Sequence, residues 1–207
     1  FKVGDLVRAE AGEDGELKLT RLSPTRLNGK VSADGTKLGN YEFAPDVEIL
    51  DTYEGKAVKI YADRLAGMTL QDGMVQYYTL DGQGHIDRMV LKEATGDAYT
   101  YGILTDINNQ SAGMFIQVTY TMFLEGQYVS YVSQNKDFNV TKTGPFYLKG
   151  TPSDPKEFCL LNRVPAGAKI VDNTTLAYGN EIYLFADNVI VYEHVDGRYI
   201  QSTLARV

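Results

Sequence analysis

The sequence predicts an all-β fold made of two related small units, each a barrel-like or sandwich-like arrangement of hairpins, with an insertion in the second. Three observations support this prediction. Apolar and polar residues alternate with a period of two in short runs. An acidic residue followed by glycine separates many of these runs. The 207 residues include 15 tyrosines and 20 glycines, which favour strands and tight turns over helices.

The alternating runs are spread along the whole chain, and each is bounded by Gly, Asp, Asn or Pro. They lie at 6–10, 16–22, 47–49, 57–60, 114–118 and 128–132. No segment has the spacing of an amphipathic helix. We therefore expect at most a single helical turn at 63–69 and another at 155–161.

The turns between these runs share one chemistry, an acidic residue directly before glycine. The glycines of four such turns are Gly15, Gly55, Gly126 and Gly197. A short hairpin needs a residue with a positive φ at this position, and glycine adopts it without a Cβ clash. The sequence therefore predicts a positive φ at each of these glycines.

One segment of the chain recurs. Residues 43–56 align without gaps to residues 185–198, and the alternation of apolar and polar positions stays in register. Because this register directs Val47 and Val189 to the same side of their strands, we expect both valines to be buried.

A second element recurs as well, since the hairpin predicted at 5–22 resembles the one at 73–91. The order along the chain is hairpin, barrel-like segment, hairpin, barrel-like segment. This order predicts a first unit at 1–94 and a second at 95–207, and the second copy carries an insertion at about 110–175.

Charge and composition exclude several classes of function. With 20 Lys and Arg against 27 Asp and Glu, the net charge is −7 and the pI about 4.9, so the chain lacks the basic character that nucleic acid or anionic lipid requires. The longest apolar stretch, 114–124, is interrupted by polar residues, and we expect no membrane insertion. The one cysteine, Cys159, excludes an intrachain disulfide and is predicted to be a small buried apolar residue. Because the chain begins with Phe1 rather than methionine, we expect a processed form or an excised piece.

The sequence does not predict an enzyme, a metal site or a cofactor. Its two histidines, His85 and His194, lie at predicted hairpins, and no motif of a zinc protease, serine hydrolase or phosphate-binding loop occurs. The acidic residues fall mostly at turns and on outward positions. They are nevertheless numerous enough to leave a glycosidase-type pair of carboxylates open as an alternative.

The insertion at about 110–175 provides the candidate binding surface. We expect Tyr120, Tyr131, Asp137 and Tyr147 to line it. Tyrosines on strands serve most often as cross-strand packing pairs, and the other interpretation is a face that binds sugar or protein.

Three motifs point to a family. They are Gly4-Asp5-Leu6-Val7-Arg8, the turn Asp14-Gly15-Glu16-Leu17, and the segment from Tyr41 to Ile49 that reads Tyr-x-Phe-Ala-x-Asp-Val-x-Ile. They resemble the β-rich repeats that accompany S-layer homology domains in cell-surface proteins of Gram-positive Firmicutes. The resemblance covers most of 4–105 and returns at 181–207, whereas the helical, wall-binding S-layer homology domains are not seen in this chain.

The resemblance implies a non-catalytic extracellular module at the bacterial cell surface, acting as a spacer, a lattice component or an adhesive surface. Its implied partners are cell-wall glycan or neighbouring surface-protein modules. The alternative is a carbohydrate-binding or carbohydrate-processing β domain that uses exposed tyrosines and paired acids. A component of a phage-like tail is also compatible with repeated β modules.

Overall fold

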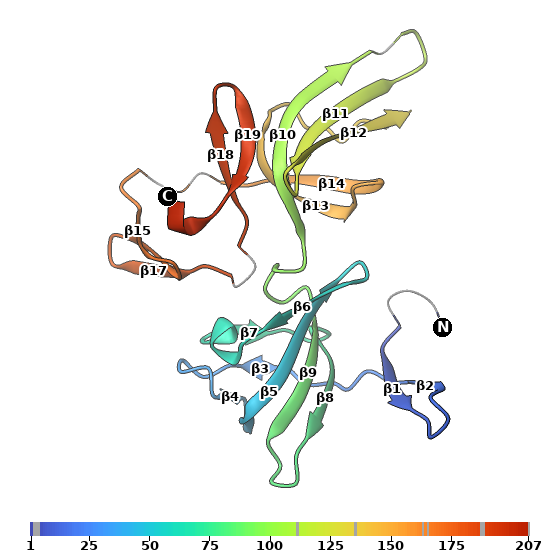
Figure 1. Cartoon of the computed structure of the whole chain (residues 1–207), viewed down its shortest axis with the longest axis vertical. Helices are drawn as coiled ribbons and strands as arrows, with labels where there is room; N and C mark the ends of the chain where they lie inside the picture. Colours follow the sequence, from blue (N-terminus) through green and yellow to red (C-terminus); the bar gives the residue numbers. More distant parts are fainter. Residues whose placement is uncertain are drawn as a thin grey trace. The chain divides into compact units, whose positions relative to one another are not determined.

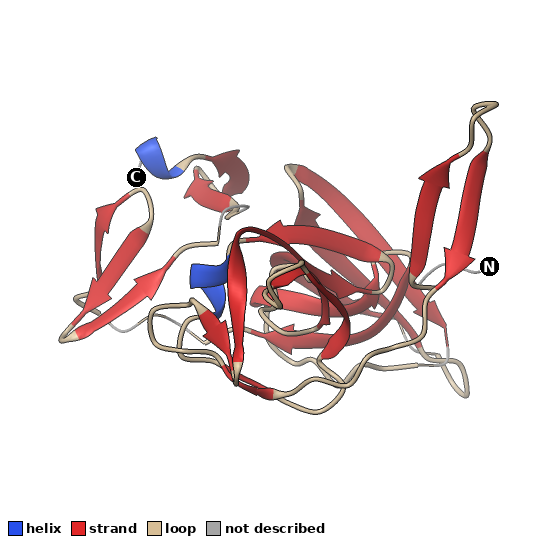
Figure 2. Ribbon diagram, turned by 90° about the horizontal axis from the view of Figure 1, so that it is seen from below, coloured by secondary structure: helices blue, strands red, loops and turns tan. Residues whose placement is uncertain are grey.

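In the residues that the structure describes, the fold consists of strands and two short 3-10 helices, η1 (Ala62–Leu65) and η2 (Leu204–Arg206) (Figure 2). The computed structural model describes residues 1, 5–110, 112–134, 136–162, 164, 166–186 and 189–206. The all-β prediction is confirmed. The chain divides into two compact units, Phe1–Ala98 and Tyr99–Val207.

Unit 1 contains a separate N-terminal hairpin and a five-stranded curled sheet (Figure 1). In the sheet, β5 lies beside β9 in parallel, and the remaining pairs are antiparallel. The strands of unit 1 are β1 (Val7–Ala11), β2 (Leu17–Arg21), β3 (Gly29–Lys30), β4 (Lys37–Leu38), β5 (Tyr41–Tyr53), β6 (Lys56–Ile60), β7 (Thr69–Leu70), β8 (Val75–Leu80) and β9 (Ile86–Lys92).

The core of unit 1 follows from the alternation along its strands. On β5, Ile49 is fully buried whereas its neighbour Leu50 is exposed, because successive side chains of a strand point to opposite faces. The β8–β9 hairpin, which continues the same sheet, adds Ile86 and Met89 to this core, and they are 0% and 1% exposed. The core is therefore shared between the segment around β5 and a hairpin that comes later in the chain.

Unit 2 contains a five-stranded antiparallel sheet, a three-stranded sheet and a hairpin. The five-stranded sheet has the order β12-β11-β10-β13-β14 and takes up most of the region that the sequence marks as an insertion. The strands of unit 2 are β10 (Thr100–Asn109), β11 (Gln117–Leu124), β12 (Gln127–Gln134), β13 (Gly144–Thr151), β14 (Asp154–Leu160), β15 (Lys169–Asp172), β16 (Thr175–Tyr178), β17 (Glu181–Leu184), β18 (Val191–Val195) and β19 (Arg198–Ser202).

The two expected helical turns have different outcomes. A 3-10 helix, η1, begins close to the first expected position. The turn expected at 155–161 is wrong, because residues 155–160 belong to β14, which pairs with β13. Pro155 is tolerated in this strand since it lies opposite Gly150 next to a β-bulge, where the ladder is interrupted.

The prediction for the hairpin glycines is confirmed. Gly15, Gly55, Gly126 and Gly197 have φ values of 81, 81, 82 and 78 degrees. At three of these turns the acidic residue before glycine also has a positive φ, which is the type I′ geometry of a two-residue hairpin loop.

Replacement of Gly197 by valine is expected to destabilise unit 2 by about 1–2 kcal/mol, because a branched side chain is strained at a positive φ. An added Cβ at Gly197 meets no atom within 4 Å, so the cost comes from the backbone and not from a clash. Urea unfolding followed by tyrosine fluorescence measures the change. Gly197→Asn is the control and should cost less, since asparagine tolerates the left-handed region. Equal stability of the Val and Asn variants would contradict the prediction.

The end of β5 with β6 and η1 has a geometric match in β18, β19 and η2. Within each hairpin the residues pair in the same register, Ile49 with Ile60 and Val191 with Ser202. Each hairpin is followed by a 3-10 turn that begins at the same relative place. In both turns the arginine N–H donates to the carbonyl three residues earlier at 3.1 Å, Arg64 to Tyr61 and Arg206 to Thr203.

The match extends upstream to an aspartate turn. Asp34 accepts hydrogen bonds from the hydroxyls of Ser32 and Thr36, and Asp172 accepts one from the hydroxyl of Thr174. These hydrogen bonds lower the pKa of Asp34 from its ordinary value of 3.8 to about 2, and they lower the pKa of Asp172 as well.

Each aspartate turn is also held to the strand that follows it. The N–H of Phe43 donates to the carbonyl of Thr36, and the N–H of Phe185 donates to the carbonyl of Thr174, both at 2.8 Å. The stretch from Thr174 to Phe185 is longer than the stretch from Thr36 to Phe43. Residues 187 and 188 of the aligned segment lie outside the described residues.

Replacement of Ser32 by alanine is expected to raise the pKa of Asp34 from about 2 toward 3.8, because the largest stabilising hydrogen bond is removed. Since the folded pKa lies below the unfolded value, the stability from this carboxylate is complete above about pH 4 and is lost as the pH falls through 2. An NMR titration of the carboxyl carbon measures the shift. The control, Thr174→Val, should leave Asp34 unchanged, and identical titration of Ser32→Ala and the unaltered protein would contradict the prediction.

One expectation from the alignment is wrong. Val47 is half-buried against the core of unit 1, but Val189 is 39% exposed. The physical reason is that Val47 lies in a core closed by the β8–β9 hairpin. Among the described residues of unit 2, no strand takes the place of that hairpin.

Candidate binding surfaces

Tyr120 lies in the core of unit 2 and not on a surface. Its side chain is fully buried, and its ring lies 5.0 Å from the ring of Phe158. Its hydroxyl donates to Asp137 at 3.0 Å and accepts the N–H of Phe138 at 3.1 Å, and burial raises its pKa. The expectation that Tyr120 lines a binding surface is therefore wrong, because Tyr120 is buried. Its hydrogen bonds with Asp137 and Phe138 hold the loop after β12 against the core.

Tyr131 and Tyr147 lie apart from each other on the five-stranded sheet. Tyr131 is half-buried opposite Tyr120 and packs its ring 6.1 Å from Phe138. On β13, Tyr147 alternates with buried neighbours and so points to the other face of the sheet. The structure does not bring the four expected residues together into one surface.

Tyr147 belongs instead to a tyrosine row, which we define as Tyr99, Tyr101 and Tyr147. All three side chains are half-buried, and the rings of Tyr99 and Tyr147 stack with centroids 4.8 Å apart and planes 12 degrees apart. A hydrogen bond to Cys159, which is half-buried rather than buried, raises the pKa of Tyr147 to about 12. Flat aromatic surfaces of this kind can stack against the apolar face of a sugar.

Polar side chains line two further pockets, one in each unit. A pocket of about 440 Å³ in unit 2 is lined by Tyr128, His194 and Tyr199, and no carboxylate lines it. A pocket of about 700 Å³ in unit 1 is lined by the carboxylates of Asp5, Glu54 and Glu93 and by two lysines. Of these two pockets, only the one in unit 1 could supply the paired acids of a glycosidase.

Exposed apolar side chains gather on two other parts of the chain. On the β1–β2 hairpin, Leu17 and Leu19 are 67% and 39% exposed. From β15 to β19, the exposed apolar residues are Ile170, Val171, Tyr178, Ile182, Tyr183, Leu184, Val189, Ile190, Val195 and Ile200. Contiguous exposed apolar surface commonly marks an interaction site.

The sequence contained a signal for these apolar faces. Residues 185–198 align without gaps with 43–56, so the alternating apolar positions that unit 1 places beside β9 occur again in unit 2. No described strand of unit 2 pairs there as β9 does, and Val189 and Val195 in this segment are exposed.

Within the described residues, no helix is long and apolar enough to cross a membrane, and no group of three His, Cys, Asp or Glu side chains could hold a metal ion. Searches of protein-family models, curated proteins and solved structures find no match to this chain.

Proposed function

We propose that this protein is a non-catalytic structural module of a bacterial cell surface, which joins neighbouring β modules through its strand edges and apolar sheet faces. The single observation that carries the proposal is the geometric match of β5, β6 and η1 with β18, β19 and η2. Proteins built from recurring β units bury a continuous core by placing one unit against the next. In unit 1 this element is paired with β9, whereas its match in unit 2 has no such neighbour among the described residues. This difference supports a role in assembly with neighbouring modules.

The extracellular placement rests on the resemblance to repeats that accompany S-layer homology domains. Neighbouring surface-protein modules are the partners that the exposed apolar faces fit best, and cell-wall glycan is the other. The net charge of −7 favours solubility and disfavours nucleic acid as a partner.

The test is fractionation of the cells that produce the protein, with an antibody raised against this chain. The proposal predicts that the protein is found in the cell-wall fraction or outside the cell. Recovery in the cytosol with none at the wall would overturn it. A parallel incubation with cell-wall glycans should release no reducing sugar.

Carbohydrate binding is the second candidate, and the tyrosine row supports it. The stacked rings of Tyr99 and Tyr147 suit one face of a sugar ring. Titration of the protein with soluble cell-wall oligosaccharides, followed by tyrosine fluorescence, measures this binding. Loss of binding in Tyr147→Ala, with binding retained in the control Tyr61→Ala, would favour this candidate. Glycan hydrolysis that disappears in Glu54→Gln or Glu93→Gln would favour carbohydrate processing.

A further inference from the structure

The β1–β2 hairpin is built like the β8–β9 hairpin of unit 1. In each turn, the N–H of the first residue donates to the carbonyl four residues later, at 2.7 Å in β1–β2 and 2.8 Å in β8–β9. The N–H of the fourth residue donates back to the first carbonyl at 3.1 Å in both. The turns are 12–16 and 81–85, and the first strand pairs beyond them are Ala11 with Leu17 and Leu80 with Ile86.

This equivalence assigns Leu17 and Leu19 to the positions of Ile86 and Met89. Leu17 matches Ile86 directly, and Leu19 matches Met89 because a bulge in the β8–β9 pairing adds one residue to β9. Ile86 and Met89 are 0% and 1% exposed in the core of unit 1, whereas Leu17 and Leu19 are 67% and 39% exposed. The hairpin thus has apolar side chains at the positions that are buried in β8–β9, but in β1–β2 these side chains are exposed.

The segment 169–206, which we call the open half, presents the opposite situation. It matches the part of unit 1 from β3 to η1. In unit 1 that part shares a core with the β8–β9 hairpin. Val31, which pairs with Leu38, is fully buried there, and Val58, which pairs with Asp51, packs against the core. By strand pairing, their counterparts in the open half are Ile170, which pairs with Leu176, and Ile200, which pairs with Glu193. Ile170 and Ile200 are 40% and 37% exposed.

The open half also has a strand edge without the neighbour that β5 has in unit 1. In unit 1, β9 pairs with β5 at both ends of that long strand, from Phe43 to Thr52 (Figure 1). In the open half the corresponding strand is divided into β17 and β18, and in the part of the chain that the structure describes these pair only with β16 and β19. An unpaired edge beside an apolar face is a template for strand addition.

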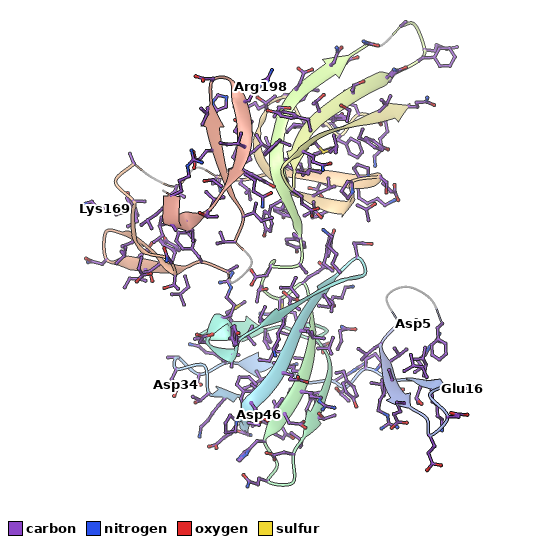
Figure 3. All side chains as sticks on the ribbon, viewed as in Figure 1. Asp5, Glu16, Asp34, Asp46, Lys169 and Arg198 are labelled. Atoms are coloured by element: carbon purple, nitrogen blue, oxygen red, sulfur yellow. The ribbon has the colours of Figure 1, made fainter. Side chains whose placement is uncertain are left out.

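We propose that the β1–β2 hairpin of one molecule docks on the open half of a second copy, in the place that β8–β9 occupies within unit 1. Leu17 and Leu19 then lie against Ile170 and Ile200, and β2 adds to the β17–β18 edge as β9 adds to β5. The register leaves Glu16 at the hairpin tip, outside the shared core (Figure 3). The occupant is a second copy because the described chain carries both a hairpin that is built like β8–β9 with an exposed apolar face and an open half that matches the partner of β8–β9.

The contact joins two different surfaces, so a pair of molecules still has one hairpin and one open half that can make the same contact again. A head-to-tail contact of this kind that does not close into a ring builds an open chain. The inference rests on the proposed structural role and deepens it, since it names a second copy as the neighbouring module.

Sedimentation velocity over about 1 µM to 1 mM tests the proposal, because an edge-strand contact of this size is expected in that range of affinity. The unaltered protein should sediment as 23.0 kDa when dilute and as larger species when concentrated. Two variants separate the surfaces. The donor variant carries Leu17→Ser and Leu19→Ser, and the acceptor variant carries Ile170→Ser and Ile200→Ser.

Each variant alone should associate at least about tenfold more weakly than the unaltered protein, because two apolar side chains are lost from the contact. Mixed in equal amounts, they should form one species of twice the monomer mass, since one intact hairpin meets one intact open half and both remaining surfaces are disabled. The controls, Lys18→Ser on the other face of the hairpin and Lys169→Ser next to Ile170 on β15, should associate normally. Circular dichroism of every variant checks that its strands are retained.

Three outcomes would overturn the proposal: an unaltered protein that is monomeric throughout, association that persists in both variants, or variants that fail to combine. Its failure is distinguishable from failure of the proposed function. A monomeric protein found at the cell wall overturns only the head-to-tail contact, whereas a self-associating protein found only in the cytosol overturns only the cell-surface role.

Discussion

Replacement of Asp51 by alanine is expected to destabilise unit 1 by about 3 kcal/mol. Asp51 is fully buried on β5. Its carboxylate accepts the N–H of Ala94 at 3.0 Å, the N–H of Thr95 at 2.7 Å and the hydroxyl of Thr95 at 2.6 Å. Alanine leaves these three donors without their acceptor and releases the loop after β9. Urea unfolding followed by tyrosine fluorescence measures the loss.

Asp46→Ala is the matched control, because Asp46 is an exposed aspartate on the same strand (Figure 3). Its replacement should change the free energy of unfolding by less than about 0.5 kcal/mol. A similar loss in both variants would show that the Asp51 hydrogen bonds contribute nothing of their own.

Replacement of Gly102 by valine is expected to destabilise unit 2 by about 3 kcal/mol or more. Gly102 is buried on β10, and a Cβ there would lie 2.7 Å from the carbonyl oxygen of Phe123 and 3.3 Å from the ring of Phe146. It would also contact the side chain of Leu124. The backbone carbonyl cannot move without disturbing the β10–β11 pairing, so the strand itself must shift.

Gly82→Val is the control for a glycine without such neighbours. An added Cβ at Gly82 meets no atom within 4 Å, so the variant should lose less than about 1 kcal/mol. Thermal unfolding by circular dichroism compares the two. Equal melting temperatures for Gly102→Val and the unaltered protein would contradict the packing that we describe around β10.

The strands and their turns could be predicted because both depend on local chemistry. Alternation along 47–49 and 57–60 marks β5 and β6, and the acidic residue before Gly55 marks the turn between them. The buried role of Asp51 could not be predicted in full. Its inward position between Ile49 and Tyr53 was a signal, but its partners lie more than 40 residues away in the sequence.

The candidate surface was less predictable than the fold. Tyr120 and Tyr147 both lie on strands, and sequence alone does not tell which face of a curled sheet becomes the core. The answer depends on how β10 to β14 pair, which places Tyr120 inside and Tyr147 outside. The alignment of 43–56 with 185–198 predicts the match between the open half and β5, but not that β18 has no described neighbour in the place where β5 has β9.

Amide hydrogen exchange along β18 tests the open half most directly. In dilute protein, residues 191–195 should exchange faster than residues 49–53 of β5, because β5 lies between two strands and β18 has one. At high concentration, residues 191–195 should gain protection together with residues 17–21 of the hairpin. Exchange along β18 that equals that of β5 in dilute protein, or that stays unchanged as the concentration rises, would contradict the open half and its head-to-tail contact.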